Sequence, residues 1–138
     1  MVKFEKEGYY VIGADKEKNR FYLSVFGAWK SPNEVPDYIN HVKQGLQELK
    51  SGFACLTHIN DKKPPGIAIT KLQSQCQKEI MKAGVKRTAV VLPKGRILQQ
   101  LSLRVITRFT GMEMKMFEMV EEADKWLDEK DKEDAQKK

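Results

Sequence analysis

Short runs rich in β-branched and aromatic residues alternate along this chain with longer runs in which apolar residues recur at helical spacing. Strand-type runs lie at 21–26, 53–59 and 88–92, and a helix-type run follows each of them. Two strands separated by a helix pair in parallel, through a right-handed crossover. The alternation therefore predicts an α/β domain built on a largely parallel sheet.

An antiparallel hairpin is expected to open the domain. Residues 9–14 and 20–26 are both apolar enough to form strands, and the polar run 15–19 between them ends in Asn, which favours a turn. Helices are expected between Ser31 and Gly52 and over 67–83, 96–110 and 120–129, with a last strand over 112–117. The fold class is thus α/β, a single-domain mixed sheet with an opening β-hairpin and alternating βα units.

The length of 138 residues fits one domain, which we expect to span 1–130, followed by a charged flexible tail over 131–138. Hydrophobic residues make up 41% of the chain, which is enough for a core. The longest stretch without a charge, 51–60, is about half of a membrane span, so no transmembrane segment is expected. No export signal is visible at the N-terminus, and the expected location is cytoplasmic.

Cysteine and histidine are scarce. Cys55 and Cys76 lie in apolar runs and are expected to be reduced core thiols. His41 is expected on the exposed side of its helix, and His58 is the only other histidine. Their spacings fit no zinc pattern, and no glycine-rich dinucleotide or P-loop motif occurs. The sequence therefore predicts no metal and no cofactor.

Charge is unevenly distributed along the chain. Residues 71–115 contain ten bases and two acids, a net charge of +8, whereas residues 117–138 contain nine acids and five lysines. A basic segment of this kind favours an anionic partner. Lys94, Gly95 and Arg96 follow a predicted strand and open a predicted helix, where backbone N–H groups and the helix dipole attract anions.

Arg104 and Arg108 lie on the same side of that predicted helix as Arg96. Two interpretations remain open for this face: a solvated polar surface, or an anion-binding or partner-binding site. On the opposite side the apolar surface is unusually wide. It indicates either deep burial or contact with a partner, a lipid or a second copy of the chain, so that a homodimer stays open.

A second candidate site is the loop that follows the strand at 53–59. His58, Asn60 and Asp61 lie at the carboxyl end of that strand, where open α/β sheets bind ligands. His58 and Asp61 are either an oriented base with its partner or a pair that caps the loop. The chain contains no Gly-x-Ser-x-Gly motif, and we expect it not to be an enzyme.

The order of these elements resembles the STAS domains, the anti-sigma-factor antagonist superfamily, and especially their SpoIIAA-like branch. The residues that carry the resemblance are the strand 21–26 with the loop through Trp29, the strand and loop 53–61, the helix-to-strand junction 83–91, Met116-Phe117 and the segment 121–127. The resemblance covers about residues 21–127 and implies a binding role on an α/β fold.

Members of the phospho-switch branch carry an Asp-Ser pair at the start of a helix, and the serine is phosphorylated. The corresponding residues here are Pro65-Gly66-Ile67-Ala68-Ile69-Thr70, which contain no serine. Thr70 is the one hydroxyl in this stretch, and we expect a structural role for it and no phosphorylation.

The sequence predicts a non-catalytic STAS-like binding module for a protein partner or an anionic or lipid ligand, without the phospho-serine switch. The alternative is a nucleic-acid-binding protein that uses the basic 71–115 surface. Steep salt dependence of binding would favour the alternative.

Overall fold

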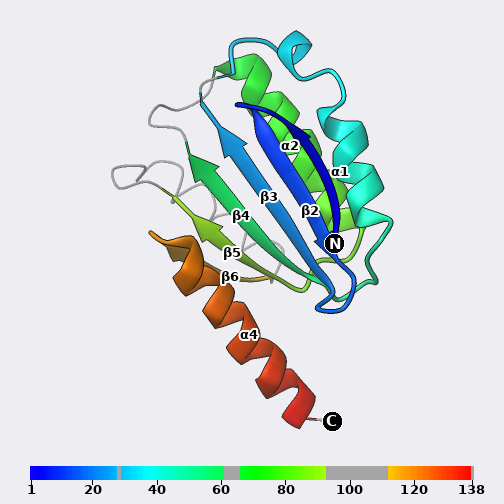
Figure 1. Cartoon of the computed structure of the whole chain (residues 1–138), viewed down its shortest axis with the longest axis vertical. Coiled ribbons are helices and arrows are strands. Elements are labelled where there is room, and N and C mark those ends of the chain that lie inside the picture. The colour runs from blue at the N-terminus through cyan, green and yellow to red at the C-terminus, as the bar shows by residue number, and fades with distance from the viewer. Residues whose placement is uncertain (28, 61–65, 93–111, 138) are drawn as a thin grey trace.

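The computed structural model describes residues 1–27, 29–60, 66–92 and 112–137. Within these residues six strands form one sheet: β1 (Val2–Lys6), β2 (Tyr10–Asp15), β3 (Arg20–Phe26), β4 (Ala54–Asn60), β5 (Arg87–Val91) and β6 (Glu113–Phe117). The helices are the short 3₁₀ turn η1 (Pro32–Glu34) and the α-helices α1 (Tyr38–Leu46), α2 (Ile67–Lys82) and α4 (Val120–Gln136). Figure 1 shows their arrangement.

The strands lie in the sheet in chain order, β1-β2-β3-β4-β5-β6. β2 is antiparallel to both of its neighbours, β1 and β3, and β3 through β6 are parallel to one another. The runs 21–26, 53–59 and 88–92, predicted as strands, form β3, β4 and β5, which are interior strands of the sheet. The predicted α/β class, mixed sheet and opening hairpin are therefore confirmed for the described residues.

Helices cover the two faces of the sheet unequally. α1 and α2 lie side by side on one face, and α4 crosses the other face over β4, β5 and β6 (Figure 1). The larger core lies under α1 and α2 and includes Phe21, Leu23 and Val42. The smaller core, under α4, centres on Leu56, Val91 and Leu127.

α1 approaches the sheet closely because it carries a glycine on its inner side. A Cβ added at Gly45 would lie 3.0 Å from Cε1 of Phe21 and 3.3 Å from Cγ2 of Ile12. Such distances are shorter than ordinary van der Waals contact. The glycine therefore sets the depth at which the α1 backbone packs against β2 and β3.

The sequence prediction missed the edge strand β1. Val2–Lys6 alternates half-buried and exposed residues and is rich in charge, which is typical of a protected sheet edge but weak as a strand signal. This strand also corrects the expected exposure of His41, which is half-buried. Its ring stacks on Phe4 at 5.0 Å between centroids, and its Nδ1 lies 2.7 Å from the hydroxyl of Tyr10.

The helix expected to begin near Ser31 is also corrected. Ser31 and Glu34 do form a capping box, but the box starts the 3₁₀ turn η1, and α1 begins only at Tyr38, after Pro36. α1 then ends at Leu46, before the predicted end at Gly52. Proline disfavours helical conformation in the preceding residue, which accounts for the break.

The C-terminal helix is longer than the sequence indicated. α4 does not end at Glu129 but continues to Gln136, so most of the predicted flexible tail 131–138 is helical. Asp131 and Asp134 in this extension contact Arg20 and Arg87 of the sheet. The third predicted helix, 96–110, lies outside the described residues.

Candidate functional site

The carboxyl ends of the parallel strands meet at one edge of the sheet, the edge at which open α/β sheets bind ligands. β3 ends at Phe26 and β4 at Asn60, which are register partners. The backbone N–H of Gly27 donates to the carbonyl of Asn60 at 3.3 Å, so the chain leaving β3 stays joined to the end of β4.

A pocket of about 380 Å³ lies beside the end of β3. It is formed where the β1–β2 turn, the end of β3 and the segment leading into η1 meet. Its lining residues are Gly8, Tyr9, Phe26, Gly27, Trp29, Lys30 and Glu34. Two of these, Gly8 and Gly27, have φ angles of 81° and 71°, a region that favours glycine, so the turns that shape the pocket depend on them.

Trp29 forms a fixed wall of this pocket. Its indole is 7% exposed and packs edge-on against Tyr38 at 4.9 Å between ring centroids. The indole N–H lies 3.0 Å from the carbonyl of Phe26 and 3.2 Å from that of Tyr9. With its polar atom satisfied and its ring held by the core, Trp29 is a rigid and almost wholly buried part of the pocket lining.

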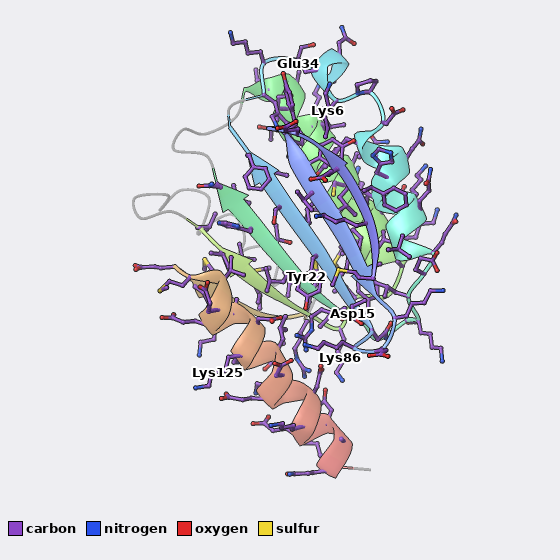
Figure 2. The ribbon with its side chains drawn as sticks, viewed as in Figure 1. Lys6, Asp15, Tyr22, Glu34, Lys86 and Lys125 are labelled. Atoms are coloured by element: carbon purple, nitrogen blue, oxygen red, sulfur yellow. The ribbon has the colours of Figure 1, made fainter. Side chains whose placement is uncertain are left out.

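The carboxylate of Glu34 is occupied by structural hydrogen bonds. One oxygen accepts the backbone N–H groups of Lys30 at 2.7 Å and Ser31 at 3.1 Å, and the other accepts the hydroxyl of Tyr9 at 3.0 Å. These hydrogen bonds lower the pKa of Glu34, and the bond from the Lys30 backbone N–H has the largest effect. Lys6 also donates to the Glu34 carbonyl, and the two residues lie together in Figure 2.

Lys30 at the pocket mouth is exposed, and its ammonium makes no ion pair with any residue that the structure describes. The charged lining residues are Lys30 and Glu34; the Glu34 carboxylate stays ionised because its pKa is lowered, and the Lys30 charge contributes to that lowering. The pocket thus places the exposed Lys30 side chain beside aromatic residues that are buried or half-buried.

His58 lies at the same edge but on the face that α4 covers. Its register partners are Ser24 on β3 and Val91 on β5. It is half-buried, and burial lowers its pKa from 6.5, with the Glu121 carboxylate opposing the shift. His58 is therefore neutral at pH 7, and within the described ranges no hydrogen bond holds its ring.

The other predicted site residues have mixed outcomes. Asn60 is exposed and contributes its carbonyl to the β3–β4 junction. Its predicted neighbour Asp61 lies outside the described residues, as do the predicted anion-site residues Lys94, Gly95, Arg96, Arg104 and Arg108. His58 and Asn60 therefore lie at the carboxyl edge of the sheet, and the site predictions for the other residues stay predictions.

Thr70 and the two cysteines have structural contacts. The hydroxyl of Thr70 donates to the carbonyl of Gly66 at 2.9 Å in the first turn of α2. Cys55 and Cys76 are free, buried thiols, as the sequence predicted. Burial raises the pKa of each thiol to about 12.

Sequence reasoning missed the pocket residues Tyr9, Lys30 and Glu34. A signal existed in the pattern Ser31 to Glu34, a capping box, but it indicates local helix geometry and not a pocket. The pocket arises because Tyr9 and Glu34, 25 positions apart, are brought together by the hairpin.

Comparison with known proteins gave no match: no family model, no curated protein and no solved structure is similar to this chain. Within the described ranges, no helix combines the length and the apolar composition needed to cross a membrane. In the same residues no three His, Cys, Asp or Glu side chains are grouped so as to hold a metal ion.

Proposed function

We propose that this chain is a non-catalytic, STAS-like binding module whose ligand site is the pocket at the carboxyl end of β3. Its ligand is an anion joined to an apolar group, carried by a lipid, a small molecule or a partner protein. The observation that carries the proposal is that the exposed Lys30 lines the same pocket as Phe26 and the fixed Trp29.

The proposed absence of catalysis is supported by the state of the candidate nucleophiles. With pKa values raised to about 12, the thiols of Cys55 and Cys76 stay protonated at neutral pH and are buried in the core. A protonated, inaccessible thiol is a poor nucleophile.

The proposed lack of a phospho-switch is supported by the position of Thr70. Its hydroxyl is engaged with the Gly66 carbonyl, a bond typical of a structural threonine in a first helical turn. Phosphate at Thr70 in protein isolated from its source would contradict this part of the proposal.

The pocket contains its own fluorescent reporter. The chain has two tryptophans, Trp29 and Trp126, and Trp126 lies on α4. A Trp126→Phe variant therefore reports on Trp29 alone. We expect hexyl phosphate and hexanoate, titrated into this variant, to change Trp29 emission saturably, whereas hexanol, which lacks the charge, should bind more weakly.

The matched variants are Lys30→Gln and Lys125→Gln, each made in the Trp126→Phe background. Both remove one exposed lysine, but Lys125 lies on α4, away from Glu34 and the pocket (Figure 2). Loss of the Lys30 charge should weaken binding of the alkyl anions about tenfold, or about 1.4 kcal/mol. The proposed site would be contradicted by equal affinities of the two lysine variants. It would also be contradicted if the Trp126→Phe protein showed no saturable change in Trp29 emission.

A further inference from the structure

The outer surface of the α1–α2 layer carries lysines and amides, and its one exposed carboxylate is that of Asp37, at the start of α1. On α2, the turn of 100° per residue identifies the side chains that face away from the buried Ile69, Cys76 and Ile80. Together with the outward side of α1 they form what we call the outer helix face: Asn40, Lys43, Gln44, Gln47, Ile67, Lys71, Ser74, Gln75, Lys78 and Lys82, all of them exposed.

The four lysines of this face have no acidic partner among the described residues. α1 contains no acid, and the single acid of α2, Glu79, is half-buried on the flank of the helix. In contrast, two bases of the predicted 71–115 surface, Lys86 and Arg87, are engaged by Asp134 of α4. Apart from Lys115 on β6, the available positive charge of the described residues in this region therefore lies on the outer helix face.

We propose that the outer helix face binds the sugar–phosphate backbone of a nucleic-acid duplex, without reading its sequence. Lys71 and Lys82 are about 17 Å apart along α2 at 1.5 Å per residue. That length reaches phosphates on both sides of a groove about 12 Å wide. The amides and Ser74 supply the neutral hydrogen-bond donors that commonly contact phosphate and sugar.

The composition of the face selects the duplex backbone over other anionic surfaces. It carries no aromatic ring on which unpaired bases would stack, and no arginine to form a bidentate contact with a base. A membrane-binding face needs apolar side chains among its cations, but here the one apolar residue, Ile67, lies at the end of α2. The five neutral polar residues between the lysines fit phosphates better than acyl chains.

The number of lysines on the outer helix face sets the expected salt dependence of duplex binding. If all four lysines contact phosphates, a plot of the logarithm of the binding constant against the logarithm of the salt concentration has a slope of about −3.6. Between 50 and 200 mM salt, affinity should then fall about a hundredfold. This behaviour does not depend on the pocket near Lys30, so the two sites are tested separately.

The experiment uses the full chain and a fluorescently labelled 20-base-pair DNA duplex of arbitrary sequence, with an RNA duplex of the same sequence in parallel. Binding is followed by fluorescence anisotropy over a range of salt concentrations. Lys78→Gln/Lys82→Gln should bind more weakly, with the slope reduced to about −1.8. The control pair Lys125→Gln/Lys132→Gln, exposed on α4, removes the same charge and should keep the full slope.

Melting temperatures of both double variants should match that of the parent, because exposed lysines contribute little to stability. Lys30→Gln should bind the duplex as the parent does, which separates this site from the pocket. The proposal is overturned if neither duplex binds at 50 mM salt, or if the two double variants lose affinity equally. It is also overturned if phosphatidylserine vesicles bind and the duplexes do not.

Discussion

Arg20 shows how one side chain joins the sheet to α4. It is fully buried, yet its Nη1 lies 2.8 Å from Asp124 and 3.0 Å from Asp128, and its Nη2 lies 2.7 Å from Asp131. The three aspartates are at spacings of four and three, which places them on one side of α4. A buried cation is tolerated only with partners of this kind.

Replacing Arg20 with Met keeps much of the side-chain volume and removes the charge. The carboxylates of Asp124, Asp128 and Asp131 would then face one another with only the exposed Lys18, 3.6 Å from Asp128, as a cation. The remaining carboxylates are 37–46% exposed, so the loss should be smaller than for a charge left unpaired in the core, and we expect about 1–2 kcal/mol of unfolding free energy to be lost. Urea denaturation at pH 7 measures the loss.

Lys16→Met is the matched control, since it breaks the exposed Lys16–Glu48 pair, which is also 2.8 Å long. Exposed pairs contribute less than about 1 kcal/mol. Similar losses in the two variants would show that the Arg20 cluster acts as an ordinary surface network.

At the scale of elements, α4 is attached at a second point along its length. Asp134 accepts a hydrogen bond from Nη1 of Arg87 at 2.8 Å and also pairs with Lys86. Arg87 in turn bonds to Glu113 of β6 at 2.8 Å. Hydrogen bonds from Arg87 and Lys86 hold the pKa of Asp134 well below its usual value of 3.8.

This pKa predicts how stability depends on pH. A carboxyl whose pKa is lower in the folded state stabilises the fold above its unfolded pKa, and this stabilisation is lost as pH falls through the folded value. For Asp134 the loss therefore begins below about pH 3.8 and continues toward lower pH. In Asp134→Asn the difference in unfolding free energy between pH 5 and pH 2.5 should be smaller than in the parent.

Glu113, whose pKa is also lowered by Arg87, provides the comparison. Glu113→Gln should reduce the pH dependence of the unfolding free energy less than Asp134→Asn does. The reason is that the pKa shift of Asp134 is the larger of the two. Exposed Glu129→Gln, on the outer side of α4, is the control and should leave the profile unchanged. An Asp134→Asn profile parallel to that of the parent would refute the assignment of this acid sensitivity to Asp134.

The elements that sequence predicted well are those specified by neighbouring residues. β3, β4 and β5 are rich in apolar, aromatic and β-branched residues because most of their positions are buried or half-buried between the helices. α2 was predicted closely, from Ile67 to its end before Gly84, where a positive φ of 94° favours glycine. Local pattern therefore predicted the centre of the sheet and the crossover beside it.

The elements that sequence missed depend on distant residues. The extension of α4 is stabilised by Arg20, 111 positions before Asp131, and nothing near Asp131 indicates that pairing. The pocket likewise requires the hairpin to bring Tyr9 to Glu34. His58 and Asn60 were predicted at the correct edge because the end of a buried strand is visible locally, whereas a site formed by three separate segments is not.

At the scale of the whole molecule, the basic and acidic parts of the chain are not independent. Counted along the sequence, residues 71–115 are strongly basic and residues 117–138 are acidic. In the fold, α4 places its aspartates against Arg20, Lys86 and Arg87 near the amino ends of β3 and β5. Net charge along the sequence therefore overstates both the free positive and the free negative surface.

Truncation tests this view. The sequence predicts that residues 131–138 are a flexible tail, whose deletion would leave stability unchanged. The structure instead places Asp131 on Arg20 and Asp134 on Arg87, so deletion leaves two largely buried guanidinium groups with fewer partners. We expect the chain ending at residue 130 to unfold at a clearly lower urea concentration than the full chain.

Two comparisons identify the cause of that loss. Removing only Lys137 and Lys138, which lie beyond the end of α4 at Gln136, should leave the urea midpoint unchanged. The full-length Asp131→Asn/Asp134→Asn variant should reproduce most of the loss, since it keeps the helix and removes the two charges. If truncation at 130 destabilises the protein but this double variant does not, the last turns of α4 stabilise the fold through something other than their carboxylates. If truncation has no effect, the pairing of the acidic helix with the buried arginines contributes nothing beyond Asp124 and Asp128, and the sequence-based interpretation of the tail is the better one.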